Sequence, residues 1–127
     1  MSDERILVVD DNPTNLKLVS DLLQWSGYQI SNATDAEHAL EAIRHTKPDL
    51  ILMDIGLPGM DGLTLTRQLK ADDATKHIRI LALTAFAMKG DKQKALDAGC
   101  DGYITKPIDT RELPDQVARS LRREITS

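Results

Sequence analysis

The sequence predicts an α/β protein built on one parallel β-sheet with helices on both faces. Short apolar runs alternate five times along the 127 residues with helix-like stretches of about 10–14 residues. Several of these runs are continuously apolar, which is typical of strands buried on both faces. Because crossovers between parallel strands are right-handed, five successive βα units form a parallel sheet covered on both sides.

Five segments have the character of strands. They are residues 6–9, 28–33, 50–54, 78–84 and 102–105. The first, third and fourth are almost entirely apolar, which predicts burial on both faces. The second has weak strand character and the fifth is brief.

Capping residues mark the starts of the first two predicted helices. Asn12 before Pro13 is a strong helix start, because asparagine caps free N–H groups and proline fits the first helical position. Gly27 is placed to end this helix. Residues 34–37 (Thr-Asp-Ala-Glu) have the form of a capping box with Thr34 as the capping residue, and the second helix stops at residues 47–48.

The remaining helices are expected at residues 63–69, 89–98 and from Leu113 onward. Gly99 closes the second of these. In the last, Leu113, Val117, Leu121 and Ile125 recur every four residues on one face. Pro114 removes a backbone donor, so we expect this helix to start late or to bend.

Composition narrows the class of protein. Apolar residues make up 41% of the chain, charged residues 28%, and the formal net charge is −4. With Cys100 alone, no disulfide framework or metal–thiolate cluster is expected. The polar N-terminus, the lack of a basic run and the lack of a span of ~20 apolar residues predict a soluble cytoplasmic protein, with no nucleic-acid partner and no membrane insertion. We expect a single domain over residues 1–127, with a core of about 5–123 and no output domain.

Four of the five predicted strands end in a chemically capable side chain. Asp10 and Asp11 follow the first, Asp54 ends the third, Thr84 the fourth, and Lys106 follows the fifth. In a parallel sheet these ends share one edge, where open α/β sheets bind their ligands. Alone, Asp54 would be read as a turn-capping residue and Asp10–Asp11 as charges that complement a helix dipole. Together they predict one shallow pocket.

That pocket would contain three carboxylates and one ammonium group, so that negative charge would exceed positive charge. Like charges ~4 Å apart repel by roughly 4 kcal/mol at an effective dielectric of ~20, so a divalent cation is expected. All-oxygen ligands favour Mg²⁺, with Mn²⁺ as the alternative. A carboxylate beside such a cation, with a hydroxyl and a lysine opposite, fits phosphoryl transfer in which the carboxylate attacks in line.

These residues resemble the receiver domains of bacterial two-component response regulators. The shared motifs are Val9-Asp10-Asp11-Asn12, Met53-Asp54 with Pro58 and Gly62, Thr84-Ala85, and Lys106-Pro107. The stretch 83–91 is most similar to stand-alone cell-division regulators. The resemblance implies a doubly wound, flavodoxin-like (βα)5 fold of strand order 2-1-3-4-5. It also implies a phosphoacceptor signalling domain rather than an enzyme.

The resemblance assigns roles by position. Asp54 would accept a phosphoryl group from a histidine kinase or a histidine phosphotransfer protein. Asp10, Asp11, Asp54 and the carbonyl of Gly56 would hold Mg²⁺. Thr84 and Lys106 would contact the phosphoryl group, and Thr84 and Tyr103 would act as a switch. Phe86, Met88, Lys89, Lys92 and Tyr103, with the last helix, form an expected docking face for a downstream effector. The protein is expected to be a monomer or weak dimer.

Other classes stay open at this point. A small phosphohydrolase with an aspartate nucleophile would use the same groups, although Gly56 stands where its second acid is needed. A flavodoxin-like cofactor carrier would share the topology, but the acidic first loop and 3% aromatic content weigh against it. A receiver cut from a hybrid kinase belongs to the same class as our preferred reading. His38, His45 and His77 are interpreted as surface residues, and Trp25 is expected to pack.

Overall fold

Five strands and five helices alternate along the chain in the computed structural model, which describes residues 4–55, 62–84, 89–105 and 108–121. In order they are β1 (Arg5–Val9), α1 (Pro13–Trp25), β2 (Gln29–Ala33), α2 (Ala36–His45), β3 (Leu50–Asp54), α3 (Gly62–Ala71), β4 (Arg79–Thr84), α4 (Lys89–Asp97), β5 (Gly102–Thr105) and α5 (Leu113–Leu121). Every predicted strand and helix is present, within one to three residues of its expected ends wherever those ends are described.

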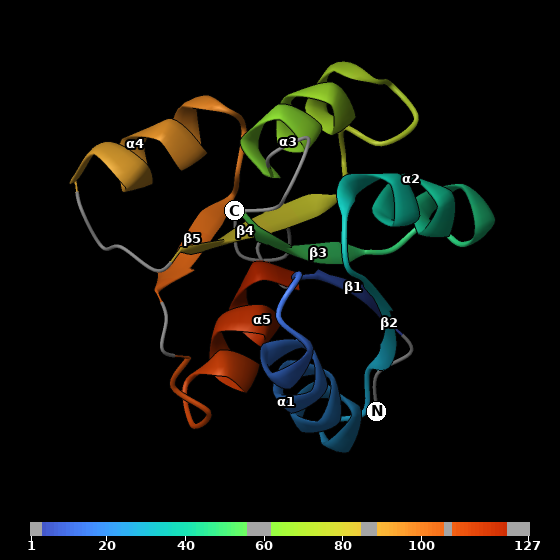
Figure 1. The fold of residues 1–127 in the computed structure, drawn as a ribbon, viewed down its shortest axis with the longest axis vertical. Coiled ribbons are helices and arrows are strands. Elements are labelled where there is room, and N and C mark those ends of the chain that lie inside the picture. The colour runs from blue at the N-terminus through green and yellow to red at the C-terminus, as the bar shows by residue number, and fades with distance from the viewer. Residues whose placement is uncertain (1–3, 56–61, 85–88, 106–107, 122–127) are drawn as a thin grey trace.

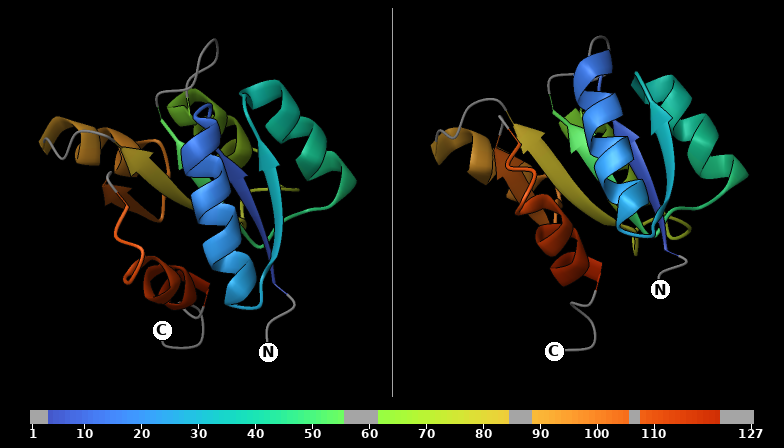
Figure 2. Two further views of the ribbon diagram at one scale, coloured as in Figure 1. Left: turned by 60° about the horizontal axis from the view of Figure 1, so that its bottom comes forward. Right: turned by 90° about the horizontal axis from the view of Figure 1, so that it is seen from below.

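The strands form one sheet in the order β2-β1-β3-β4-β5, and each neighbouring pair is parallel. Helices α2, α3 and α4 lie on one face, and α1 and α5 lie on the other (Figure 1). The strand arrows all point to the same edge (Figure 2). The predicted fold class and strand order are confirmed. Among the described residues, no helix is both long and apolar enough to cross a bilayer.

Each face of the sheet has its own apolar core. Successive side chains of a strand point to opposite faces, so Val9 and Met53 join the core under α2, α3 and α4. Their neighbours Val8 and Leu52 join the core under α1 and α5. All four are fully buried. The central strands β1 and β3 are therefore fixed from both sides, and their carboxyl ends are positioned accurately.

The ends predicted for α1 from the sequence are confirmed, but the capping residue predicted for α2 is not. Asn12 Oδ1 accepts hydrogen bonds from the N–H groups of Thr14 (2.9 Å) and Asn15 (3.2 Å), and Gly27 ends the helix at a φ of 100°. The prediction that Thr34 caps the start of α2 is wrong. Asp35 takes that place and accepts from the His38 N–H at 2.8 Å, because its carboxylate suits the positive end of the helix dipole.

The late start expected for the last helix and the packing expected for Trp25 are both wrong. Pro114 does not delay α5, which begins at Leu113, because a proline in the first turn removes an N–H group that has no partner within the helix. Trp25 does not pack: 85% of it is exposed. Helix α1 buries Val19, Ser20 and Leu23, and a residue two positions after Leu23 lies on the opposite side of the helix.

We predict a pH-dependent stabilisation at the start of α2. His38 Nδ1 lies 2.8 Å from Asp35 Oδ1, and this hydrogen bond raises the pKa of His38 above its ordinary 6.5. The His38 N–H and side chain in turn lower the pKa of Asp35 below 3.8. Because its pKa is raised in the folded state, His38 stabilises the fold at low pH, and this stabilisation is lost as the pH rises through the folded-state pKa. Because the pKa of Asp35 is lowered, its stabilisation is present at higher pH and is lost as the pH falls through its folded-state pKa. The Asp35–His38 pair therefore stabilises the fold most at pH values between the folded-state pKa of Asp35 and that of His38.

The measurement is an NMR titration of His38. In Asp35→Asn its pKa should fall back toward 6.5. The control is Asp73→Asn, an exposed aspartate paired with Lys76, which should leave the titration unchanged. An identical His38 pKa in wild type and Asp35→Asn would contradict this account.

Candidate functional site

The pairing of β1 with β3 brings three acidic residues to one edge of the sheet. Val9 is opposite Met53 in this parallel pair, so Asp10 and Asp54 follow at the same level. Asp11 comes next in the chain. The strand order reverses between β1 and β3, and such switch points are where doubly wound sheets bind ligands.

The carboxylate groups of Asp10, Asp11 and Asp54 form a compact cluster. One oxygen from each lies within 4.8 Å of the others. Asp10 is fully buried and Asp54 is 7% exposed, whereas Asp11 is open to water. The expected acidic pocket is therefore present, with two carboxylates set into the protein and one at its mouth.

Backbone hydrogen bonds fix the two buried acids. The Asp10 N–H donates to the carbonyl of Ala33 at 3.1 Å, and its Oδ1 accepts from the Asn12 N–H at 2.9 Å. The Ile55 N–H donates to the carbonyl of Leu83 at 3.2 Å, which continues the β3–β4 ladder past Asp54. The sequence revealed Asn12 as a helix cap but not as a donor to Asp10. The feature of the sequence that could have indicated this hydrogen bond is that Asn12 lies two residues after Asp10.

Gly62 allows α3 to begin directly against the end of β3. A Cβ atom at Gly62 would clash with the main-chain carbonyl of Asp54 and lie 2.9 Å from Met53 Cγ. Real Cβ atoms do not approach other atoms so closely. The glycine of the sequence motif is therefore required by the close contact between α3 and the acidic residue.

The cluster has the donor set of a hard divalent cation. Three carboxylates at this spacing repel one another when ionised, and a low-dielectric surrounding strengthens the repulsion. Oxygen ligands alone, with one carboxylate facing water, are typical of Mg²⁺, which keeps part of its hydration shell. The residues present therefore fit a magnesium ion.

Thr84 is on β4, the strand next to that of Asp54, and Tyr103 is on β5, the strand beyond it. Asp54 is opposite Leu83, so the buried Thr84 is one position nearer the strand ends. Tyr103 is opposite Ala82 and half-buried against the core beneath α2, α3 and α4. Strand alternation puts Thr84 and Tyr103 toward the same face of the sheet.

Several predicted site residues cannot be placed. Gly56, Phe86, Met88 and Lys106 lie outside the described residues. Lys89 and Lys92 belong to α4, where only the backbone is described at these positions. Thr105, the last residue of β5, pairs with Thr84 at the edge that carries the acids.

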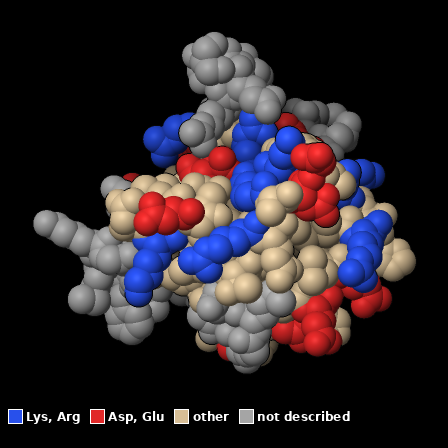
Figure 3. Space-filling view, turned by 90° about the horizontal axis from the view of Figure 1, so that it is seen from above, with Lys and Arg blue, Asp and Glu red and all other residues tan. Residues whose placement is uncertain are grey.

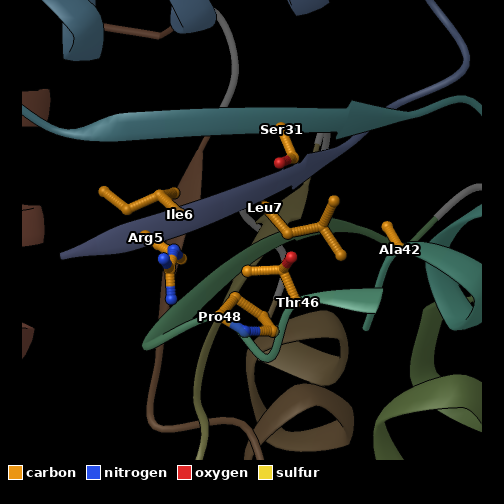
Figure 4. Close-up of a pocket in the computed structure, with 7 residues that line it drawn as sticks. All are labelled: Arg5, Ile6, Leu7, Ser31, Ala42, Thr46 and Pro48. Atoms are coloured by element: carbon orange, nitrogen blue, oxygen red, sulfur yellow. The ribbon is translucent and has the colours of Figure 1, made fainter. Parts of the chain in front are cut away.

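Other groups with possible chemistry lie away from this edge. A cavity of about 10 Å³, enough for one water molecule, lies by the start of β1 and is lined in part by Arg5, Ser31 and Thr46 (Figure 4). Cys100 is buried, and burial raises the pKa of its thiol. A buried neutral thiol is unreactive. The acidic cluster remains the candidate site.

Comparison with known proteins decides the family. Residues 6–118 match the model of the response regulator receiver domain. The chain belongs to this family. It is accordingly a phosphoacceptor signalling domain rather than an enzyme, and the hydrolase and flavodoxin alternatives are set aside.

Individual relatives agree with this. The chain is 48% identical to the polar-differentiation response regulator DivK of Brucella anthropi over 103 residues, which are 81% of this chain and 84% of DivK. A CheY-like receiver domain protein from Methanospirillum hungatei superposes with a TM-score of 0.89 at 30% identity over 98% of each chain. The receiver domain of sensor histidine kinase PA1611 from Pseudomonas aeruginosa has a TM-score of 0.82 at 34% identity, over 99% of this chain and all of that one. Its structure contains a magnesium ion in the active-site cleft.

We predict that Gly62→Ala destabilises the protein by about 1–3 kcal/mol, the usual cost of overpacking, because the new methyl group must push α3 away from Asp54. Urea unfolding measures the change. The matched control is Gly102→Ala, whose Cβ would meet, among the described residues, the Leu81 Cδ2 methyl at 3.0 Å, a group that can move. Equal losses in the two variants would argue against the assigned contact.

Proposed function

We propose that Asp54 accepts a phosphoryl group from a phosphohistidine on a histidine kinase or histidine phosphotransfer protein. The observation that carries this proposal is the cluster of three carboxylates at the switch point of the sheet. Membership of the receiver family supports a histidine kinase as the partner. Asp54 is the strand-end acid of the three, and it is almost buried.

Asp10, Asp11, Asp54 and the carbonyl of Gly56 would hold Mg²⁺, with Mn²⁺ as a substitute. The carboxylate spacing of 4.8 Å or less supports the first three ligands. The magnesium ion in the PA1611 receiver supports the choice of metal. When bound, the cation neutralises the acids and the oxygens of the incoming phosphoryl group.

In the proposed step, an Asp54 carboxylate oxygen attacks the phosphorus atom in line. The new P–O bond forms as the P–N bond to the donor imidazole breaks. The imidazole keeps the electron pair and takes a proton from water. Lys106 pairs with the phosphoryl oxygens and Thr84 donates its hydroxyl to one of them.

Signalling then follows from a shift between conformations that already exist. Movement of Thr84 toward the phosphoryl group alters packing near Tyr103, which faces the same side of the sheet. We place the affected docking face on α4, β5 and α5, with Phe86, Met88, Lys89, Lys92 and Tyr103. A downstream protein effector reads this face.

The natural setting is inferred from relatives. Similarity to DivK supports a stand-alone cytoplasmic regulator of the cell cycle, with residues 1–127 forming one domain without an output domain. Similarity to the PA1611 receiver supports the alternative of a receiver within a hybrid histidine kinase. The two differ in whether the natural gene encodes a kinase region joined to this domain.

We predict that acetyl phosphate with Mg²⁺ adds one phosphoryl group to the wild-type protein and none to Asp54→Asn, since an amide lacks the nucleophilic oxygen. Intact-protein mass spectrometry measures the adduct. The control is Asp49→Asn, an exposed acid just before the other end of β3, which should be phosphorylated normally. A modified Asp54→Asn protein, or an unmodified wild type, would refute the acceptor role.

We also predict that Asp11→Ala weakens Mg²⁺ binding at least tenfold, because loss of a direct ligand costs no less than loss of a supporting residue. Isothermal titration calorimetry with Mg²⁺ measures the affinity. The control is Asp21→Ala, which removes a partly exposed acid on α1 that pairs with Lys17, and it should bind Mg²⁺ as wild type does. Unchanged affinity in Asp11→Ala would remove that residue from the metal site.

A further inference from the structure

Hydrogen-bond donors near the acidic cluster, rather than charges on the outer surface, are the groups that can hold Asp10 in place. The face covered by α2, α3 and α4 shows interspersed acidic and basic side chains (Figure 3), so the described surface there offers no field of one sign to balance the cluster. Asp10 is fully buried. A buried carboxylate is stabilised by the donors that it contacts.

One of these donors is the backbone N–H of Asn12, 2.9 Å from Asp10 Oδ1. Asn12 is also the capping residue of α1, where its own Oδ1 accepts from the N–H groups of Thr14 and Asn15. In a capping box, a Glu or Gln at the third helical position accepts from the N–H of the capping residue. Asn15 has that position here, and the N–H of Asn12 donates to Asp10 instead. The start of α1 is thus bonded directly to a buried acid of the site.

Three features fix the backbone of Asn12. Its side chain bonds to the first turn of α1, its carbonyl accepts from the N–H of Leu16 at 3.0 Å, and Pro13 follows it. A proline disfavours the helical region for the residue before it. Asn12 accordingly has an extended backbone, with φ −91° and ψ 112°. Its N–H is therefore a preorganised donor to Asp10.

The segment held in this way carries two of the three acids. The Asp10 N–H donates to the carbonyl of Ala33 at 3.1 Å, so residues 10–12 are bonded to β2 at one end and to the start of α1 at the other. Asp11 lies between these two attachments. Fixing Asn12 therefore fixes the carboxylate of Asp10 and also the backbone on both sides of Asp11.

We propose that the side chain of Asn12 is a positioning group for the metal site: by capping α1, it holds Asp10 and Asp11 in place for a divalent cation. This inference rests on the proposed magnesium site, and Asn12 acts through these two acids rather than through contact with the ion. Without the cap, residues 10–12 are less ordered, and part of the free energy of Mg²⁺ binding is used to order them. Mg²⁺ affinity therefore falls, whereas the reaction of the loaded site does not change.

Isothermal titration calorimetry with Mg²⁺ tests the effect of the cap. Asn12→Ala should bind Mg²⁺ about fivefold more weakly than wild type, since loss of a cap is typically worth ~1 kcal/mol. Asn12→Ser, which keeps a capping oxygen, should bind within about twofold of wild type. The matched control is Asp72→Ala, which removes a 2.9 Å bond from a side chain to the Ala74 N–H between α3 and β4, at the opposite edge of the sheet, and should bind as wild type does.

Amide exchange measured by NMR without metal tests the intermediate step. After correction for the intrinsic rate of each residue type, the amide at position 12 should exchange at least about threefold faster in Asn12→Ala than in wild type or Asn12→Ser, because the donor is no longer held against Asp10. Pro13→Ala, which keeps the cap but frees the Asn12 backbone, should change exchange and Mg²⁺ affinity in the same direction. This second variant tests the inference even if Asn12→Ala does not fold.

Equal Mg²⁺ affinity or equal amide exchange in wild type and Asn12→Ala would overturn this inference, as would a loss that Asn12→Ser shares. Phosphorylation by acetyl phosphate separates it from the acceptor role. At saturating Mg²⁺, Asn12→Ala should react at the wild-type rate, with about fivefold more Mg²⁺ needed for half of that rate. A wild type that is not phosphorylated contradicts the acceptor role alone, because Mg²⁺ binding and amide exchange do not depend on it.

Discussion

The repulsion among three carboxylates is the constraint around which this molecule is arranged. Asp10, Asp11 and Asp54 lie within 4.8 Å of one another, and two of them are buried. Such a cluster costs free energy in the absence of a counter-charge. It persists because the strands that carry the three acids are held by apolar packing on both faces of the sheet.

These strands are the central pair β1–β3, which has an apolar core on each face. Val8, Val9, Leu52 and Met53 are fully buried just before the acids, and α3 packs against the end of β3 through Gly62. Moving the carboxylates apart would disturb both cores. The fold therefore uses hydrophobic burial to fix a charge arrangement that is typical of a magnesium-dependent phosphoacceptor.

The same edge of the sheet connects the site to the surface. Thr84 and Tyr103 are on adjacent strands and face one side, the side of α4. In the proposed function, a phosphoryl group on Asp54 shifts the position of Thr84 while β1 and β3 stay in place. The proposed switch depends on this arrangement, in which the acidic cluster lies on β1 and β3 and Thr84 and Tyr103 lie on the neighbouring strands β4 and β5.

The fold and the acidic cluster could be predicted because they depend on local patterns. Continuous apolar runs identify buried strands, and parallel topology then places Asp10, Asp11 and Asp54 together. Side-chain surroundings depend on packing that no local pattern encodes. The exposure of Trp25, the Asp35 cap of α2 and the close approach at Gly62 each became apparent only with the helices in place. Lys106 and Gly56, outside the described residues, stay predictions.

The most direct test of the central claim is the unfolding free energy of wild type and Asp10→Asn, measured by urea titration without divalent cations. Asparagine removes one charge and keeps an oxygen that can accept from the Asn12 N–H. Repulsion in the cluster predicts that the variant is more stable by roughly 1–4 kcal/mol, and that saturating Mg²⁺ removes or reverses the difference. A variant no more stable than wild type in metal-free buffer would contradict the account.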